Sequence, residues 1–201
     1  MRRSARFPLA AFVVKMRIIA GDFRGRRLHH PPPKSYRIRP TLDRVRESVF
    51  NIIAGKVQGA RVLDLFAGTG AMGMEALSRG AQFCAFVDNG PQAVRLIREN
   101  VRLLAVEDRS RIMQEKVSSA ISRLCSEGEL FDLIFMDPPY GRGYIDKTLQ
   151  IVGPVAGSET VVISEQHKSD GPPLVPLSAW QKKLDRKYGD TLISLYCKLT
   201  L

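Results

Sequence analysis

The sequence has few of the residues that build disulfide frameworks or metal centres. Its 201 residues include only 3 cysteines and 3 histidines, and Cys84, Cys125 and Cys197 lie far apart. An odd number of scattered cysteines argues against a disulfide scaffold and predicts reduced thiols in a cytoplasmic protein. No cysteine and histidine stand at the spacing of a zinc site, so we expect no bound metal.

Long apolar runs are missing as well. No stretch approaches the roughly 18 consecutive apolar residues that a membrane-spanning helix needs, so we expect no membrane partner. The hydrophobic content of 44% is ordinary for a globular chain, and a length of 201 residues predicts one main domain.

Acidic residues are scarce in the first quarter of the chain. Residues 1–46 contain 13 Lys and Arg but 2 acids, whereas residues 47–201 contain 18 of each, so the whole net charge of +11 lies in the first quarter. Charge concentrated in this way predicts a phosphate-binding surface and a nucleic-acid partner. Residues 1–15 contain no acid and are expected to form a mobile basic extension, with Met16 as an alternative start.

Residues 16–40 are predicted to form an RNA-binding β-hairpin and linker. Two short segments flank the turn at residues 21–25, and three prolines at 31–33 impose an extended linker. A helix with an apolar face at 3.6-residue spacing is expected to follow, capped by Thr41. The expected RNA-binding residues are Arg24, Arg26, Arg27, Lys34, Arg37, Arg39, Thr41 and Arg44.

From residue 60 onward, apolar strand patterns alternate with helix patterns, and residues 41–201 are predicted to form the catalytic domain. The expected strands are 61–66, 83–88, 111–114, 131–137 and 160–165, and the expected helices lie near 70–79, 91–104, 117–126 and 143–152. This alternation predicts an α/β fold with a mostly parallel sheet that is covered on both faces. Residues 183–188 and 192–199 are expected to add an antiparallel hairpin.

A glycine-rich turn follows the first expected strand. Gly68, Gly70 and Gly73 allow a tight turn into a helix whose first N–H groups have no partner within the helix. The spacing matches a dinucleotide-binding fingerprint, but the nearby carboxylate of Asp64 would repel a pyrophosphate. Asp64 suits a ligand that carries an ammonium group and no phosphate, such as S-adenosylmethionine. A tight turn that binds no ligand is the alternative interpretation.

Three acids, Asp64, Asp88 and Asp137, each end an expected strand. Because ligands of parallel sheets bind at the carboxyl ends of the strands, where the strand order reverses, we expect these acids to line one edge.

The expected catalytic group is Asp137-Pro138-Pro139-Tyr140. Two prolines stiffen the backbone, so that the Asp137 carboxylate and the Pro138 carbonyl can both accept from the exocyclic amine of a base. Tyr140 offers a ring on which the base can stack. The pattern is typical of methyl transfer to a planar nitrogen, in which positioning and electrostatics supply most of the rate.

Taken together, these motifs resemble the RsmD family of bacterial methyltransferases, which act on a guanine N2 of small-subunit ribosomal RNA. Residues 17–26, 39–51, 64–70, 75–81 and 137–140 carry the resemblance. It implies a class I S-adenosylmethionine-dependent methyltransferase, Rossmann-like, with a seven-stranded, mostly parallel sheet, an antiparallel last strand and a small N-terminal β-hairpin. It also implies that the guanine is flipped into the pocket at residues 137–140.

The resemblance further implies roles for single residues. Asp64 and the turn at residues 68–70 would hold the methionine part of the cofactor, and Asp88 would accept from the ribose, where the family commonly has Glu. The family often has Asp near position 116 for the adenine; here Glu115 or a backbone carbonyl would substitute. The expected cofactor-binding residues are Asp64, Phe66, Ala67, Gly68, Thr69, Gly70, Asp88, Asn89 and Glu115.

Other functions stay open at this point. An adenine-N6 DNA methyltransferase shares the four-residue motif, but the 61 residues after Tyr140 leave no room for a DNA-recognition domain. A non-catalytic RNA-binding or assembly protein would not need the intact motif, and Asp64 argues against an NAD-dependent oxidoreductase. The expected partner is small-subunit ribosomal RNA or the assembling 30S subunit, bound by a monomer. His167 is expected to be a loop residue without a partner, and Trp180 to lie at the edge of the core.

Overall fold

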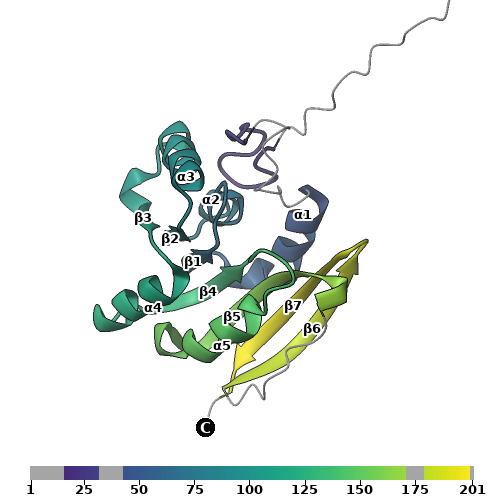
Figure 1. The fold of residues 1–201 in the computed structure, drawn as a ribbon. Helices are drawn as coiled ribbons and strands as arrows, with labels where there is room; N and C mark the ends of the chain where they lie inside the picture. The colour runs from purple at the N-terminus through teal and green to yellow at the C-terminus, as the bar shows by residue number, and fades with distance from the viewer. Residues whose placement is uncertain (1–15, 32–42, 171–178, 200–201) are drawn as a thin grey trace, which may run out of the picture.

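The computed structural model describes residues 16–31, 43–170 and 179–199 (Figure 1). The predictions for residues 1–15 and for Lys34, Arg37, Arg39 and Thr41 lie outside the described residues.

A seven-stranded sheet in the order β3-β2-β1-β4-β5-β7-β6 forms the centre of the molecule. Strands β1 to β5 pair in parallel, and β7 pairs antiparallel with both β5 and β6. The expected mostly parallel sheet with an antiparallel end is therefore confirmed. The strands are β1 (Arg61–Leu65), β2 (Phe83–Asp88), β3 (Ser110–Gln114), β4 (Phe131–Met136), β5 (Ala156–His167), β6 (Trp180–Tyr188) and β7 (Thr191–Lys198).

Helices cover both faces of this sheet (Figure 1). Successive side chains of a strand point to opposite faces. Val62 of β1 accordingly packs with α1, α2 and α3, whereas Leu63 and Leu65 pack with α4 and α5. The helices are α1 (Asp43–Ile52), α2 (Ala71–Ser78), α3 (Pro91–Leu104), α4 (Val117–Ser126) and α5 (Tyr144–Ile151), with single 3-10 turns η1 (Ala54–Lys56), η2 (Glu107–Arg109), η3 (Gly153–Val155) and η4 (Lys168–Asp170).

Residues 16–31 contain the predicted small hairpin in a short form. One antiparallel bridge joins Arg17 to Arg27, and neither side extends into a strand. Met16, Ile18 and Leu28 are each less than 5% exposed and belong to the core that also holds α1 and α2. This segment, called here the N-terminal loop, is stabilised by two kinds of contact. The N–H groups of Ile18 and Leu28 donate across the hairpin to the carbonyls of Arg26 and Met16, at 2.9 and 3.0 Å, and apolar side chains pack on α1 and α2.

Among the helices of the described residues, none is long and apolar enough to cross a membrane.

Candidate functional site

The expected site residues meet at the carboxyl edge of the sheet. Leu65 at the end of β1 lies opposite Val87 of β2 and Met136 of β4, so the chain leaves these three strands at one level. Asp88 and Asp137 therefore lie at the same edge. The strand order reverses between β1 and β4, which is where open α/β sheets bind their ligands.

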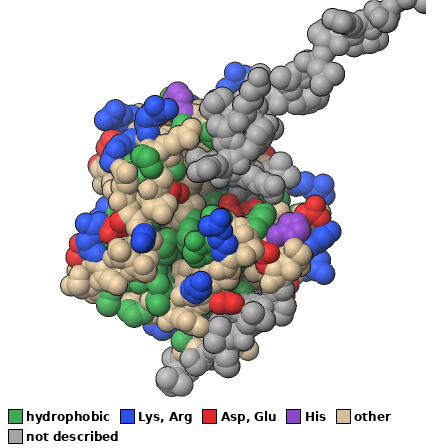
Figure 2. Space-filling model, viewed as in Figure 1, with side chains coloured by type: hydrophobic (Ala, Val, Ile, Leu, Met, Phe, Trp, Pro, Cys, Tyr) green, Lys and Arg blue, Asp and Glu red, His purple; other side chains and the backbone are tan. Residues whose placement is uncertain are grey.

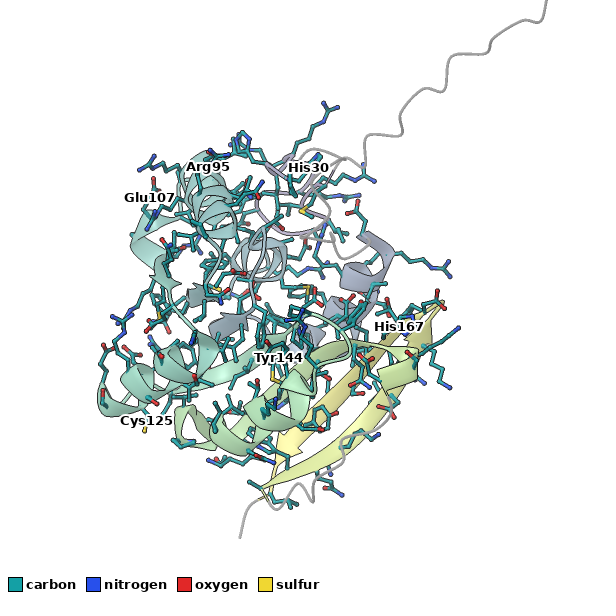
Figure 3. All side chains as sticks on the ribbon, viewed as in Figure 1. His30, Arg95, Glu107, Cys125, Tyr144 and His167 are labelled. Carbon is teal, nitrogen blue, oxygen red and sulfur yellow. The ribbon has the colours of Figure 1, made fainter. Side chains whose placement is uncertain are left out.

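The turn after β1 has an unusual backbone. Phe66, Gly68 and Gly70 all have positive φ angles, of 59°, 57° and 77°. Glycine adopts this conformation readily, but Phe66 does so at an energetic cost, and such strain concentrates at ligand sites. The ring of Phe66 lies 5.7 Å from that of Tyr144, the first residue of α5. Figure 3 labels Tyr144 near the centre of the view.

Asp64 lies one residue inside β1 and not at its end, which corrects the expected position. Its side chain is buried, and Oδ2 accepts a hydrogen bond of 3.0 Å from the Gly73 N–H in α2. Burial raises the pKa of Asp64 to about 7, and the charge of Asp88 adds to this effect. Asp64 therefore holds α2 against the sheet, and a cationic ligand nearby would favour its ionised form.

Asp88 connects the end of β2 to two turns. Its Oδ2 accepts from the Gly68 N–H at 2.9 Å, and its Oδ1 accepts from the Gly90 N–H at 2.8 Å. The Ala67 N–H donates to the carbonyl of Val87 at 3.0 Å. These bonds set the path of the glycine turn, and the half-buried carboxylate keeps lone pairs that can accept from hydroxyl groups. Asn89 beside it is exposed.

Two other expected cofactor residues already have protein partners. The hydroxyl of Thr69 is buried and lies 3.4 Å from the sulfur of Met16, so any contact of Thr69 with a ligand would come from its backbone. Glu115 forms an ion pair with Arg123 of α4. A contact of Glu115 with an adenine stays a prediction, and it would compete with this ion pair.

The Asp137–Tyr140 segment leaves β4 toward β5. Asp137 and Tyr140 are half-buried, Pro138 is buried and Pro139 is exposed. The Tyr140 hydroxyl donates to Glu165 Oε1 at 3.3 Å. Burial, followed by the carboxylates of Glu165 and Asp137, raises the pKa of Tyr140 to about 12, so the phenol stays neutral at physiological pH.

His167 was expected to be a loop residue without a partner, and this expectation is wrong. It ends β5, its ring centroid lies 5.7 Å from that of Tyr140, and its Nδ1 lies 2.6 Å from Ser169 Oγ. Figure 3 shows His167 beside the end of the β6–β7 hairpin. His167 and Glu165 together hold the ring of Tyr140. Trp180, by contrast, is buried as expected, and its indole N–H donates to the Leu149 carbonyl at 2.9 Å.

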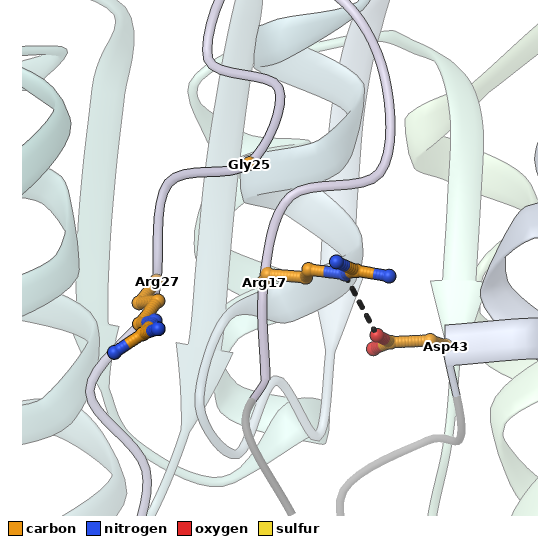
Figure 4. A pocket seen from close by; sticks show the side chains of 4 residues that line it. All are labelled: Arg17, Gly25, Arg27 and Asp43. Carbon is orange, nitrogen blue, oxygen red and sulfur yellow. Dashed lines mark ion pairs between the residues drawn. The ribbon is translucent and has the colours of Figure 1, made fainter.

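The described candidates for RNA binding are all on the surface. Arg24, Arg26 and Arg27 are exposed on the N-terminal loop, and Arg44 is exposed on α1. A cavity of about 300 Å³ lies between this loop and α1, lined by Arg17, Gly25, Arg27 and Asp43. Figure 4 shows Arg17 reaching toward Asp43, with its Nε 3.6 Å from Oδ2, while Arg27 points away from them.

Sequence reasoning did not identify the buried charges that hold the N-terminal loop. Glu75 of α2 is fully buried and accepts from the backbone N–H groups of Ile19 and Ala20, at 2.8 and 3.0 Å. It also pairs with Arg46 of α1, at 3.5 Å, and with Arg79, at 2.8 Å. The available signal was an acid in the middle of the apolar helix pattern Met74–Leu77, which predicts a buried and paired charge.

Figure 2 shows hydrophobic side chains gathered near the middle of the face in view, with Lys and Arg side chains around them.

Within residues 16–31, 43–170 and 179–199, no three His, Cys, Asp or Glu side chains are grouped so that they could hold a metal ion. The expectation of no bound metal stays a prediction.

Comparison with known proteins identifies the family. The family model described as "conserved hypothetical protein 95" matches residues 16–197. The chain is 35% identical over 185 residues to ribosomal RNA small subunit methyltransferase D of Escherichia coli, covering 90% of this chain and 89% of that protein.

Solved structures agree with this assignment. The putative methyltransferase yhhF of Escherichia coli superposes with a TM-score of 0.79 at 31% identity, covering 92% of this chain and 98% of that one. SMU.776, a putative methyltransferase complexed with SAH, superposes with a TM-score of 0.64 at 15% identity, covering 78% of this chain and 48% of that one. At this identity the likeness shows a common fold and no more. The class I methyltransferase fold expected from the motifs is thereby confirmed, and the chain belongs to the RsmD family.

Proposed function

We propose that this protein transfers a methyl group from S-adenosylmethionine to the exocyclic N2 of a guanine in small-subunit ribosomal RNA. The observation that carries the proposal is the meeting of the glycine turn, Asp88 and Asp137 at one edge of the sheet, where β1 and β4 leave it at one level. The 35% identity to a small-subunit ribosomal RNA methyltransferase supports the substrate class.

The cofactor would bind at the turn after β1. The carboxylate of Asp88 would accept from the ribose hydroxyls, and Asp64, next to Gly73, would favour the ammonium of the methionine part. The backbone of residues 66–70, which already bends through positive φ angles, allows a close approach of the ligand. The bound SAH of a neighbour with the same fold supports this choice of cofactor. S-adenosylmethionine supplies a methyl group on a sulfonium.

The base would be held by the Asp137–Tyr140 segment after it is flipped out of its stack. The Asp137 carboxylate and the Pro138 carbonyl accept from the N–H groups of the amine and so return its delocalised lone pair toward the nitrogen. Tyr140, held by Glu165 and His167, supplies a neutral ring for stacking. The rate then comes from positioning and electrostatics, without a covalent intermediate.

The RNA backbone would lie along the basic side chains. Arg24, Arg26, Arg27 and Arg44 are exposed to phosphates, and the expected contacts from Lys34, Arg37, Arg39 and Thr41 complete this part of the proposal. Affinity should therefore fall steeply with salt. We also infer that the protein acts as a monomer in the cytoplasm, on ribosomal RNA or on the assembling 30S subunit.

The test is to identify the methylated nucleoside. The purified protein is incubated with labelled S-adenosylmethionine and either naked small-subunit RNA, small subunits or double-stranded DNA, and the product is digested to nucleosides. Labelled N2-methylguanosine from either RNA substrate is expected. N6-methyldeoxyadenosine from DNA, or label in no substrate, would overturn the proposal.

A further inference from the structure

We propose that the edge strand β6 is a second phosphate-binding surface, which extends the basic surface of the N-terminal loop and α1 and guides RNA toward Tyr140. This inference rests on the proposed function. The three quarters of the chain after residue 46 are neutral as a whole, yet β6 alone contains 4 Lys and Arg and 1 acid. Charge concentrated on one exposed strand calls for an anionic partner.

The cations of β6 are available to a ligand. Lys182 forms an ion pair of 2.8 Å with Asp185. Lys183, Arg186 and Lys187 are exposed and form no ion pair with the described residues. Residues 171–178, which precede this part of the chain, contain no acid. The phosphate-binding surface proposed here is the exposed edge of β6 with Lys183, Arg186 and Lys187. Arg186 and Lys187 are consecutive, so their side chains leave this edge toward opposite faces of the sheet.

The course of β6 connects these cations with the candidate catalytic segment. Tyr188 at its end pairs with Thr191 of β7, which in turn pairs with His167 of β5. His167 is the residue whose ring contacts Tyr140, at 5.7 Å between centroids. At roughly 3.4 Å per residue, Lys183 lies roughly 17 Å from Tyr188 along the strand, so the cations extend over this distance toward the end of β6 that adjoins His167 and Tyr140.

The same end of β6 adjoins the first basic region. The hydroxyl of Tyr188 is hydrogen-bonded to Ser48 of α1, and α1 also carries the exposed Arg44. Figure 1 shows α1 beside this end of the β6–β7 hairpin. Arg186 lies opposite Ile193 of β7, and Ile193 packs in the core on the α1 side of the sheet. Because residues directly opposite each other in a sheet share a face, the side chain of Arg186 lies on the α1 side too. Through Arg186, the basic surface thus continues from the N-terminal loop over α1 to β6.

Lysines on an edge strand also serve a purely structural purpose, because they discourage pairing with a second chain. The two roles differ in what they predict for salt dependence. A cation that neutralises a phosphate adds about 0.7 to 0.9 to the slope of log affinity against log salt, whereas a cation that protects an edge adds nothing.

The experiment measures RNA affinity across a salt series for the wild-type protein and for the triple variant Lys183→Gln, Arg186→Gln, Lys187→Gln, with small-subunit ribosomal RNA as the probe. The slope of the variant should be shallower by about 2 to 3, which corresponds to about 100-fold weaker binding or more at 0.1 M salt if the lines meet at 1 M. The Kd for S-adenosylmethionine should not change.

A matched control removes three exposed cations elsewhere, in Lys56→Gln, Arg98→Gln, Arg102→Gln, on η1 and α3. This control should keep the wild-type slope. If the triple variant aggregates, the single variants Arg186→Gln and Lys187→Gln test the inference instead. Each should make the slope of log affinity against log salt shallower by about 1. Equal slopes for the wild type and the β6 variants would overturn the inference about β6 and leave the proposed function intact. A wild-type protein that binds no RNA would overturn both.

Discussion

Arg46 and Glu75 form an ion pair with both side chains fully buried, and Nε lies 3.5 Å from Oε2. Arg46 also donates to Asp43 at 3.0 Å and to the carbonyl of Arg17. Because Glu75 accepts from the N–H groups of Ile19 and Ala20, the pair joins the N-terminal loop to α1 and α2. The basic loop is therefore held rigidly on the helix that follows the glycine turn.

Replacing Arg46 with Met should destabilise the protein strongly. Removing one partner of a buried ion pair leaves an unpaired buried charge and typically costs about 3–5 kcal/mol. For a domain of this size, the expected drop in Tm is about 6–20 °C in thermal unfolding. Arg44→Met, on the exposed side of the same helix, should change stability by less than about 0.5 kcal/mol. Equal melting temperatures for the two variants would contradict the proposed role of the pair.

Gly21 and Gly25 form a matched pair for testing how the N-terminal loop docks. Both have positive φ, of 80° and 83°, so replacement by Ala strains each backbone by about 1–2 kcal/mol. A Cβ at Gly21 would lie 1.8 Å from the Ser78 carbonyl oxygen, whereas a Cβ at Gly25 would meet no atom within 4 Å.

Gly21→Ala should therefore lift the loop off α2, and Gly25→Ala should not. The measurement is hydrogen exchange at the amides of Asp22 and Phe23, which donate to the Ser78 carbonyl at 2.8 Å and to its hydroxyl at 3.0 Å. Exchange should accelerate in Gly21→Ala beyond its rate in Gly25→Ala. Similar protection in both variants would show that the loop does not depend on this contact.

Asp64 should make stability depend on pH. Its pKa is raised from 3.8 to about 7 in the folded state, so the unfolded chain loses this proton first as the pH rises. Relative to Asp64→Asn, the wild type should therefore lose free energy of unfolding between about pH 4 and pH 7, by about 4 kcal/mol in total, and then level off. Urea titrations of both proteins across this range measure the difference. Parallel curves would mean that Asp64 ionises normally.

The same group should link cofactor affinity to pH. If the ammonium of S-adenosylmethionine favours the ionised form of Asp64, affinity should rise about tenfold per pH unit well below pH 7 and become constant above it. Calorimetric titrations should show this dependence for the wild type and a flat profile for Asp64→Asn. If the affinity of the wild type for S-adenosylmethionine does not change with pH, Asp64 does not interact with the ammonium of the cofactor.

Asp137→Ala should abolish methyl transfer while cofactor binding survives. Loss of one group that stabilises the transition state lowers kcat by about 100- to 1000-fold, and Asp137 is expected to contribute at least this much. The paired measurements are turnover on RNA and the Kd for S-adenosylmethionine. Glu159→Ala, an exposed acid near the opposite end of β5, is the control and should keep full turnover. A variant with wild-type turnover would exclude the proposed role of Asp137.

The sequence alone determined the elements whose signals are local. Apolar runs predicted β1, β2, β4 and the middle of β5, because strands that are buried on both faces need mostly apolar side chains. The pattern is weaker for β3, which lies at the edge of the sheet. The glycine turn and the Asp137–Tyr140 segment were also predicted from the sequence. Glycine permits backbone conformations that other residues avoid, and proline fixes its own φ angle, wherever they occur. The alternation of strands and helices predicts a parallel sheet, in which the carboxyl ends of the strands lie at one edge, and these two segments follow two such strands.

Only the tertiary structure decided how the charged and aromatic side chains of the site are held. Glu75 and Ile19 are 56 residues apart in the chain, and Tyr140 and Glu165 are 25 apart. No local pattern encodes such contacts, because they exist only after distant elements have packed. For the same reason Asp64 lies one residue inside β1, where it accepts a hydrogen bond from α2, and not at the edge that it was expected to line.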